Sequence, residues 1–549
     1  MKRIYLKKET IMSAKLFVFA AGLVFNLCAQ AQTPLDDLAA QSSKKIVSGQ
    51  YLESYKLIED YLQQQKNFNL NNCAETLNKI NDTFYKIPTD MLIPDTDDKM
   101  QFFKNNGVSI MYKTRDFRES VKDKFFNMSG SIQEKSKCAN AVKKTLLYSR
   151  YTEELVAEYL LSRQIISHQN SEVLSKHEST LETPLSKFDG QSFKFESGDV
   201  VLVRGVGINS AMTARIADEE QYFSHIAIVG EDQKGQLVLI EALKSGLTAT
   251  PLDKYIREEL ARVSVFRFLN SETSKKAGQI AFETYDKKIK QSGTTFPYDF
   301  AFNENDKSEF FCSEVIQYAY SLATNGNLKI PDFRTTAHKL ADSGFLKKVG
   351  TEFSEFFAPS DIELNKEFKL VVDWRNLKIT PRERLADATF ISLLSWVTEK
   401  KYDTSSGFFF SSITSLLQKV RELGLFKSQI PPNISYDALR TYVNLFLVDK
   451  TLSAQIGTIQ AVVQKLTGFS LVCKDSMAIA EKLRQIDCKT QENLGVSNYH
   501  MFFKSKSFKC DDLLNDQNDK NFNILMTRLP ETVKKAIMTQ INYISQAIK

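Results

Sequence analysis

The chain has 549 residues, too many for a single hydrophobic core, so we expect several domains. Its composition, 42% hydrophobic and 25% charged, is typical of globular proteins and excludes collagen-like, mucin-like and extensively disordered chains. The formal net charge of +6 gives little support to nucleic acid or an anionic membrane as a partner.

The N-terminal 31 residues have the three parts of a secretory signal peptide. Basic residues precede the apolar run 16–27, and small residues suit cleavage after Ala31. The start is either the first methionine or Met12, because the shorter segment is still a complete signal. We therefore expect the protein to be exported, with the periplasm as the favoured location. Cys28 leaves a lipoprotein open, although the residues before it are not the small ones that usually precede a lipidated cysteine.

Residues 32–185 have a helical pattern and predict an all-helical N-terminal region. Its longest unbroken stretch covers about 143–176, and a linker is expected at 183–192. The pattern then changes to short, β-branched runs bounded by turn residues, which predict strands. These runs cover 198–205, 224–230, 235–242 and 262–268.

A helix is expected over 272–291, then a loop, then a second helix that begins at Cys312. Residues 376–549 are helical again. The expected helices there are 381–400, 409–423, 435–447, 452–467, 476–486 and 531–548. The predicted fold class is therefore α+β: a central domain over 186–375, built on a small antiparallel sheet, between two all-helical regions.

Six cysteines follow Cys28, and most of them fall into two groups. Cys73 and Cys138 lie in the N-terminal region, and three others lie near the C-terminus: Cys473, Cys488 and Cys510. An oxidising compartment would allow Cys73 to pair with Cys138 and two of the last three to pair, but spacing does not determine connectivity. Cys312 belongs to neither group. With no CxxC motif and only five histidines, we expect no metal and no cofactor.

Two strands and their loop place a histidine near a carboxylate. If residues 224–242 form a β-hairpin centred on Gln233, His225 lies directly opposite Glu241 on the same face. A carboxylate in that position can bind one imidazole N–H and select the tautomer of the ring. A slip of one residue in register would put the two side chains on opposite faces.

Cys312 begins an apolar helical stripe that continues at Val315, Ile316, Ala319 and Tyr320. It therefore faces the core in the first turn, where free N–H groups and the helix dipole favour a thiolate. A nearby imidazole would stabilise the thiolate as an ion pair, and the first N–H groups could bind an oxyanion. Singly, each residue also fits a structural role: a buried cysteine, a strand histidine or a solvated glutamate.

The segment from about 195 to 375 resembles the permuted papain-like amidases of the YiiX/YaeF type, a branch of the NlpC-like cysteine peptidases. The resemblance depends on the combination of "ESGDVVLVRG", "SHIAIV", "VLIEA", "FPYDF" and "FCSEV", in this order along the chain. In that family the histidine precedes a polar residue, and the cysteine follows on a helix. The resemblance covers about a third of the chain and implies a permuted papain-like domain over 186–375.

The resemblance implies that Cys312 is the nucleophile, His225 the general base and acid, and Glu241 the residue that orients His225. Tyr298 and Asp299 would bind substrate near the oxyanion. The implied substrate is an amide: a peptide, a cell-wall peptide or an N-acyl group. Two alternatives stay open. The same site could serve a lipid-directed thioesterase, phospholipase or acyltransferase, or the protein could be a non-catalytic binding or scaffold protein of the envelope.

Overall fold

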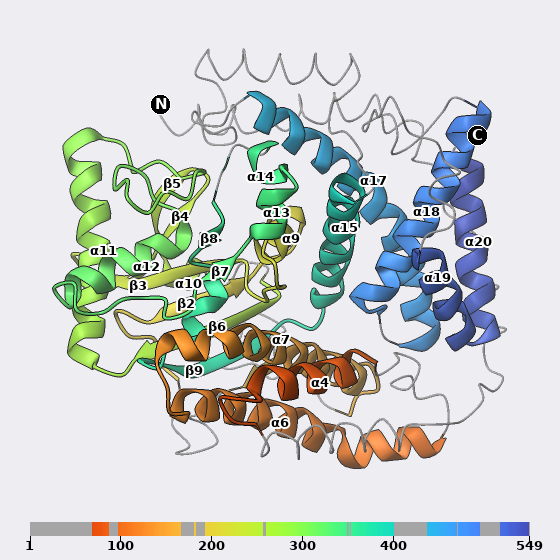
Figure 1. Cartoon of the computed structure of the whole chain (residues 1–549), viewed down its shortest axis with the longest axis horizontal. Helices are drawn as coiled ribbons and strands as arrows, with labels where there is room; N and C mark the ends of the chain where they lie inside the picture. The colour runs from red at the N-terminus through yellow and green to blue at the C-terminus, as the bar shows by residue number, and fades with distance from the viewer. Residues whose placement is uncertain are drawn as a thin grey trace.

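The computed structural model has a central α+β domain that is preceded and followed along the chain by helices, which confirms the predicted fold class. In Figure 1 this domain lies on the left, the N-terminal helices along the bottom and the C-terminal helices on the right. It describes residues 68–86, 97–165, 180–182, 193–255, 260–348, 351, 353–399, 436–468, 470–494 and 517–547. The predicted signal peptide, the linker at 183–192 and the helix at 409–423 lie outside the described residues. Among the described helices, none has both the length and the apolar character that a membrane crossing requires.

An antiparallel sheet forms the centre of the described fold. Its strand order is β1-β9-β6-β2-β3-β4-β5. The strands are β1 (Thr180–Glu182), β2 (Val200–Arg204), β3 (His225–Glu231), β4 (Leu237–Leu243), β5 (Gly246–Pro251), β6 (Arg262–Phe268) and β9 (Phe368–Arg375). A small separate pair joins β7 (Thr335–Thr336) to β8 (Glu355–Phe356). The four predicted strands correspond to β2, β3, β4 and β6, whereas β1, β5 and β9 were not predicted.

Apolar side chains cover both faces of the sheet, because strands with buried residues at successive positions cannot leave a face to water. One face packs on α11 (Ser271–Ser292) and α12 (Cys312–Ala323) through residues such as Ile226, Ile228 and Ile316. The other face, with Val201 and Ala227, packs on a second apolar cluster. The remaining helices of this part are α9 (Ile208–Arg215), α10 (Leu252–Tyr255), α13 (His338–Asp342), α14 (Phe345–Lys348) and the 3₁₀ helix η2 (Pro359–Leu364).

Three helices form the described N-terminal region: α4 (Cys73–Lys86), α6 (Asp97–Asn127) and α7 (Ile132–Ser162). The prediction of one helix over 143–176 was wrong in extent, because α7 ends at Ser162. The prediction of an all-helical region up to residue 185 was also wrong, since residues 180–182 form the edge strand β1 and pair with β9. A three-residue strand has no period-two pattern long enough to be recognised.

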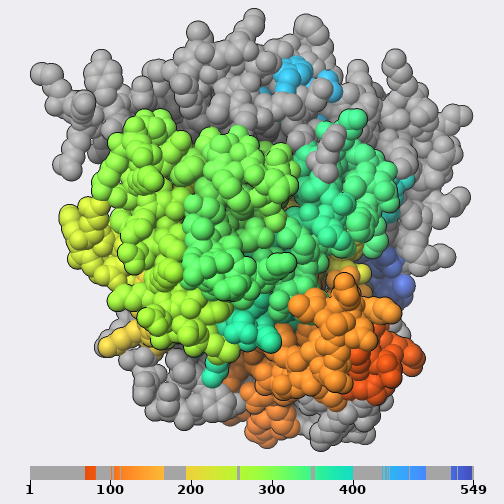
Figure 2. Space-filling model, turned by 60° about the vertical axis from the view of Figure 1, so that its left-hand side comes forward, coloured from red at the N-terminus to blue at the C-terminus, as the bar shows by residue number. Residues whose placement is uncertain are grey.

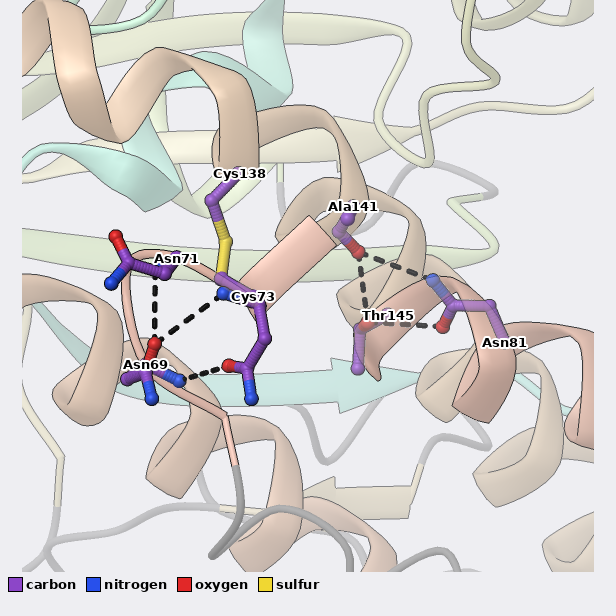
Figure 3. Close-up of a disulfide and its surroundings, with 8 residues drawn as sticks. Asn69, Asn71, Cys73, Asn81, Cys138, Ala141 and Thr145 are labelled. Carbon is purple, nitrogen blue, oxygen red and sulfur yellow. Dashed lines mark hydrogen bonds between the residues drawn. A yellow bond between two sulfur atoms is a disulfide. The ribbon is translucent and has the colours of Figure 1, made fainter. Parts of the chain in front are cut away.

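A disulfide between Cys73 and Cys138 connects the start of α4 to α7 (Figure 3). Both cysteines are buried in an apolar cluster of these helices. About two helical turns further along α4, Asn81 donates to the carbonyl of Ala141 at 3.2 Å, and Thr145 donates to Asn81 at 2.9 Å (Figure 3). The predicted pairing of Cys73 with Cys138 is thus present. Cys488 is also disulfide-bonded, whereas Cys312 and Cys473 are free.

Buried ion pairs connect the N-terminal helices to the sheet. Glu153 of α7 accepts hydrogen bonds from Arg118 of α6 at 2.5 Å, Arg262 of β6 at 3.1 Å and Arg375 of β9 at 3.0 Å. Arg118 also donates to Asp373 of β9 at 3.2 Å. A buried charge is tolerated only with such partners, and the loss of one partner would leave the others as uncompensated buried charges. The space-filling view shows the N-terminal helices and the central domain as one continuous surface (Figure 2).

The described C-terminal helices are α15 (Thr380–Thr398), α17 (Tyr436–Thr467), α18 (Cys473–Leu494), α19 (Gln517–Arg528) and α20 (Glu531–Ala547). The prediction of separate helices at 435–447 and 452–467 was wrong, because α17 is continuous. The polar residue Asp449, which interrupts the apolar pattern, accepts a hydrogen bond from Ser453 at 3.0 Å within the helix. Helix α15 is joined to the sheet by Arg204 of β2, which donates to Glu383 at 3.0 Å and also to Asp387.

Candidate active site

The hairpin that carries His225 and Glu241 has a different register from the predicted one. Ile228 lies opposite Ile240 and Glu231 opposite Leu237, so the pairing is centred on Lys234 and not on Gln233. The turn sets this register. The side chain of Asp232 accepts the backbone N–H groups of Lys234 and Gln236, at 2.8 and 2.9 Å, and Gly235 has the positive φ of 78° that closes the turn.

The corrected register brings the two predicted residues together along a diagonal. Continued beyond the observed ladder, it would place Glu241 opposite Ala227, two residues from His225. Because side chains alternate with a period of two, this change leaves His225 and Glu241 on the same face. Nε2 of His225 lies 2.8 Å from Oε2 of Glu241. The side chain of His225 is 20% exposed and that of Glu241 only 3%.

Cys312 is the first residue of α12, after Phe311 in an extended conformation. The predicted stripe is confirmed: Cys312 is 5% exposed and Ile316 is fully buried, against the face of the sheet that carries the hairpin. The thiol is free. The backbone N–H of Cys312 lies in the first turn, where it has no partner from the helix itself. The fold thus presents a sulfur and a hydrogen-bond donor at the same helix end.

His225 is hydrogen-bonded to Glu241 and lies near enough to Cys312 for the thiol to affect its pKa. Burial acts to lower the pKa of His225, but the interactions with Cys312 and Glu241 act in the opposite direction and raise it to about 10. A raised pKa means that the surroundings favour the imidazolium form. The three residues therefore form a continuous chain of thiol, imidazole and carboxylate, in which the central ring is stabilised in its charged state.

Tyr298 also lies near the thiol. The segment around it pairs with the residues just before Cys312: Phe310 donates to the carbonyl of Pro297, and Asp299 donates to the carbonyl of Phe310, both at 3.1 Å. Burial is the main reason that the pKa of Tyr298 lies well above its usual range, and a hydrogen bond to Cys312 adds to it. The phenol therefore stays protonated and can donate to the sulfur.

Both carboxylate oxygens of Asp299 are used in hydrogen bonds to the backbone. Its two oxygens accept the backbone N–H groups of Ala301 and Asn303, at 2.7 and 2.6 Å. This arrangement organises the loop that follows Tyr298. A direct contact between Asp299 and substrate stays a prediction.

Glu314 supports the start of α12. It is fully buried, accepts the backbone N–H of Phe311 at 3.4 Å and pairs with Lys307 at 2.7 Å. Burial, only partly offset by Lys307, raises the pKa of Glu314 to about 7. Asp199 follows the turn before β2, where it accepts the backbone N–H of Glu196 at 2.8 Å, and it binds Arg267 with both oxygens, at 2.8 and 2.9 Å.

One polar contact at the site was not predicted. Oγ1 of Thr250, on β5, donates to Oε1 of Glu241 at 3.1 Å. The signal that could have revealed it is the alternation of Thr248 and Thr250 between Gly246 and Pro251, which has the period of a strand beside β4. No group of three or more potential metal ligands occurs in the part of the chain that the structure describes.

Comparison with known proteins bears on the central part of the chain. No curated protein and no solved structure matches the sequence. The strands β2 to β6 and the helices α11 and α12, with His225, Glu241 and Cys312, all lie within one matched segment. Residues 194–358 match the model of a family described as permuted papain-like amidase enzyme, YaeF/YiiX, C92 family.

Proposed function

We propose that this protein is an exported cysteine hydrolase that cleaves an amide bond through an acyl-enzyme on Cys312. The observation that carries the proposal is that His225, hydrogen-bonded to Glu241, interacts with the free thiol of Cys312 at the N-terminus of a helix. This arrangement supplies a nucleophile, a proton carrier and a group that orients the carrier. The amidase family that residues 194–358 match supports the choice of an amide.

In the first half-reaction, the Cys312 thiolate attacks the carbonyl carbon of the amide and forms a C–S bond. The negative charge moves to the carbonyl oxygen, and the donors we propose for it are the backbone N–H of Cys312 and the hydroxyl of Tyr298. The tetrahedral intermediate collapses, the C–N bond breaks, and the imidazolium of His225 gives its proton to the departing amine. The acyl group stays on the sulfur as a thioester.

In the second half-reaction, neutral His225 takes a proton from water, and the resulting hydroxide attacks the thioester. The C–S bond breaks, the carboxylic acid leaves, and the thiolate and imidazolium form again. Glu241 accepts the hydrogen bond of His225 throughout, which holds the ring in one tautomer and stabilises its charge. The substrate class we propose is a peptide, a cell-wall peptide or an N-acyl amine.

Two observations support export. The N-terminal 31 residues have the organisation of a signal peptide, and the Cys73–Cys138 disulfide is the kind of bond that persists in an oxidising compartment. A free thiol near an imidazole fits a catalytic use of Cys312.

The test is incubation with peptidoglycan fragments and with a library of acyl amides, followed by mass spectrometry of the products. The wild-type protein is expected to release a carboxylic acid and an amine, and Cys312→Ala to release neither. Cys473→Ala is the matched control, because Cys473 is the other free cysteine among the described residues. Products that persist unchanged in Cys312→Ala would rule out the proposed mechanism.

Glu241→Gln is expected to narrow the pH range of activity. Since the pKa of His225 is raised to about 10, the wild-type rate should persist above the ordinary histidine value of about 6.5 and fall as pH approaches 10. The glutamine keeps the size but removes the charge that favours imidazolium. The alkaline fall should therefore move to lower pH, with the rate at pH 7 reduced about 100-fold. Glu231→Gln, at the exposed end of β3, should leave the profile unchanged.

The raised pKa of His225 also predicts that the stability of the protein depends on pH. A histidine whose pKa is higher in the folded than in the unfolded protein stabilises the fold fully below about pH 6.5 and loses that contribution as pH rises towards 10. Denaturant titrations of wild type between these pH values should show this loss, and Glu241→Gln should show less of it. Identical pH dependence in the two proteins would contradict the role of Glu241.

A further inference from the structure

The carboxylate of Glu241 is held at both oxygens. Oε2 lies 2.8 Å from Nε2 of His225, and Oε1 accepts the hydroxyl of Thr250 at 3.1 Å. The last torsion of a glutamate side chain is broad and only weakly preferred. With one hydrogen bond, the carboxylate plane could rotate about that torsion. With two hydrogen bonds, to residues on two different strands, the carboxylate plane is held in the orientation that faces His225.

We propose that Thr250 is a positioning residue of this site: its hydroxyl holds the Glu241 carboxylate in the orientation that binds His225. This inference rests on the proposed function and extends it by one residue beyond the Cys312–His225–Glu241 chain. Thr250 is uncharged and acts only through Glu241. The titratable groups that act on His225 are Cys312 of α12 and Glu241 of β4, and Tyr298 in turn interacts with Cys312.

The position of Thr250 follows from the pairing of β4 with β5. Glu241 lies opposite Thr248, and Thr250 lies opposite Leu239, so Thr250 reaches Glu241 along the diagonal. A threonine is stiff at its first side-chain torsion because it is β-branched, so its hydroxyl has a restricted direction. Glu241 is 3% exposed, and an oxygen left unpaired at this depth would lose more than one neutral hydrogen bond is worth.

Strand β5 is itself held in place. Leu247 donates to the carbonyl of Phe296 at 2.9 Å, and Thr295 donates to the carbonyl of Leu247. Gly246 has a φ of 104°, and a side chain there would collide with the Phe296 carbonyl. The segment after Phe296 leads to Tyr298, which contacts Cys312. Strand β5, which carries Thr250, is thus hydrogen-bonded to the same segment that leads to Tyr298 beside Cys312.

Thr248 provides a matched control on the same strand. It is also half-buried and also donates to Glu241, but to the backbone carbonyl, at 3.3 Å. Replacing either threonine with valine removes one hydroxyl and keeps the β-branched shape. A difference between Thr250→Val and Thr248→Val therefore reports the contact with the carboxylate, and not the loss of a threonine from β5.

The test uses two measurements that need no substrate. The first is the rate at which iodoacetamide alkylates Cys312 at pH 6, mapped by mass spectrometry; the thiolate displaces iodide in this reaction. The second is the titration of His225 by NMR of histidine-labelled protein. Thr250→Val should lower the alkylation rate about tenfold, the usual effect of losing a hydrogen bond to a charged group, and should move the His225 titration to lower pH.

Thr250→Ser should restore most of both properties, and Thr248→Val should resemble wild type. If Thr250→Val alkylates and titrates like Thr248→Val, the inference is wrong. Should the valine variant fail to fold, Thr250→Ala takes its place, with the serine variant as its reference. Neither measurement depends on turnover. An inactive wild-type protein whose His225 titration still depended on Thr250 would refute the amidase proposal and leave this inference standing.

Discussion

His225→Ala is expected to lower the rate of amide hydrolysis by about 10⁶-fold, the order of loss measured when the histidine of a catalytic triad is removed. Without the imidazole, the thiolate loses its charged partner and the departing amine loses its proton donor. Alkylation of Cys312 by iodoacetamide at neutral pH should fall in parallel. The two measurements together separate loss of the nucleophile from loss of substrate binding.

His338→Ala is the control for this substitution. His338 lies at the exposed start of α13 and uses its backbone N–H, not its ring, to bind Asp218 at 3.0 Å. Its removal should change neither hydrolysis nor alkylation. If His225→Ala and His338→Ala gave the same rates, the proximity of His225 to Cys312 would have no catalytic meaning, and the site would fit a non-catalytic domain better.

Removal of the Cys73–Cys138 disulfide should lower the free energy of unfolding of the N-terminal helices by about 4 kcal/mol. The bond closes a loop with a sequence separation of 65 residues, and the chain-entropy estimate for a loop of that size is about 4 kcal/mol. The double variant Cys73→Ala/Cys138→Ala should therefore unfold at lower denaturant concentration. Hydrogen exchange should show the loss of protection first in α4, which the disulfide joins to α7.

Two controls make this test specific. Cys473→Ala removes a cysteine that is in no disulfide and should change stability much less. Mild reduction of the wild-type protein should reproduce the faster exchange of α4, whereas the double variant should show no further change there. Equal protection of α4 in the double variant and the wild type would contradict a stabilising role for this bond.

The candidate site was largely predictable because its three residues lie on strongly patterned elements. The helical stripe from Cys312 is local, and each of its members is set by a period of 3.6 residues. The hairpin was predicted with its centre at Gln233 instead of Lys234. This shifts the pairing partner of each residue by two positions, and a shift of two leaves every side chain on its predicted face. His225 and Glu241 therefore met as expected, along a diagonal and not directly opposite.

Other contacts could not be predicted, since they join segments far apart in the chain. Thr250 binds Glu241 only because β5 lies on the outer side of β4, and a short run bounded by glycine and proline resembles a turn as much as a strand. The bonds of Glu153 to Arg262 and Arg375 join a helix to two strands more than 100 residues away. Charged residues of this kind look like a solvated helix face in the sequence.

The sequence by itself determined the strand and helix patterns of the central domain, the unpaired status expected of Cys312 and the face shared by His225 and Glu241. These depend on periodicity and on turn residues, which act over a few positions. The tertiary structure alone decided the register of the hairpin, the partner of the second Glu241 oxygen and the attachment of the helical regions to the sheet. These features depend on which segments, far apart in the chain, pack against each other. The order of residues along the chain does not show this.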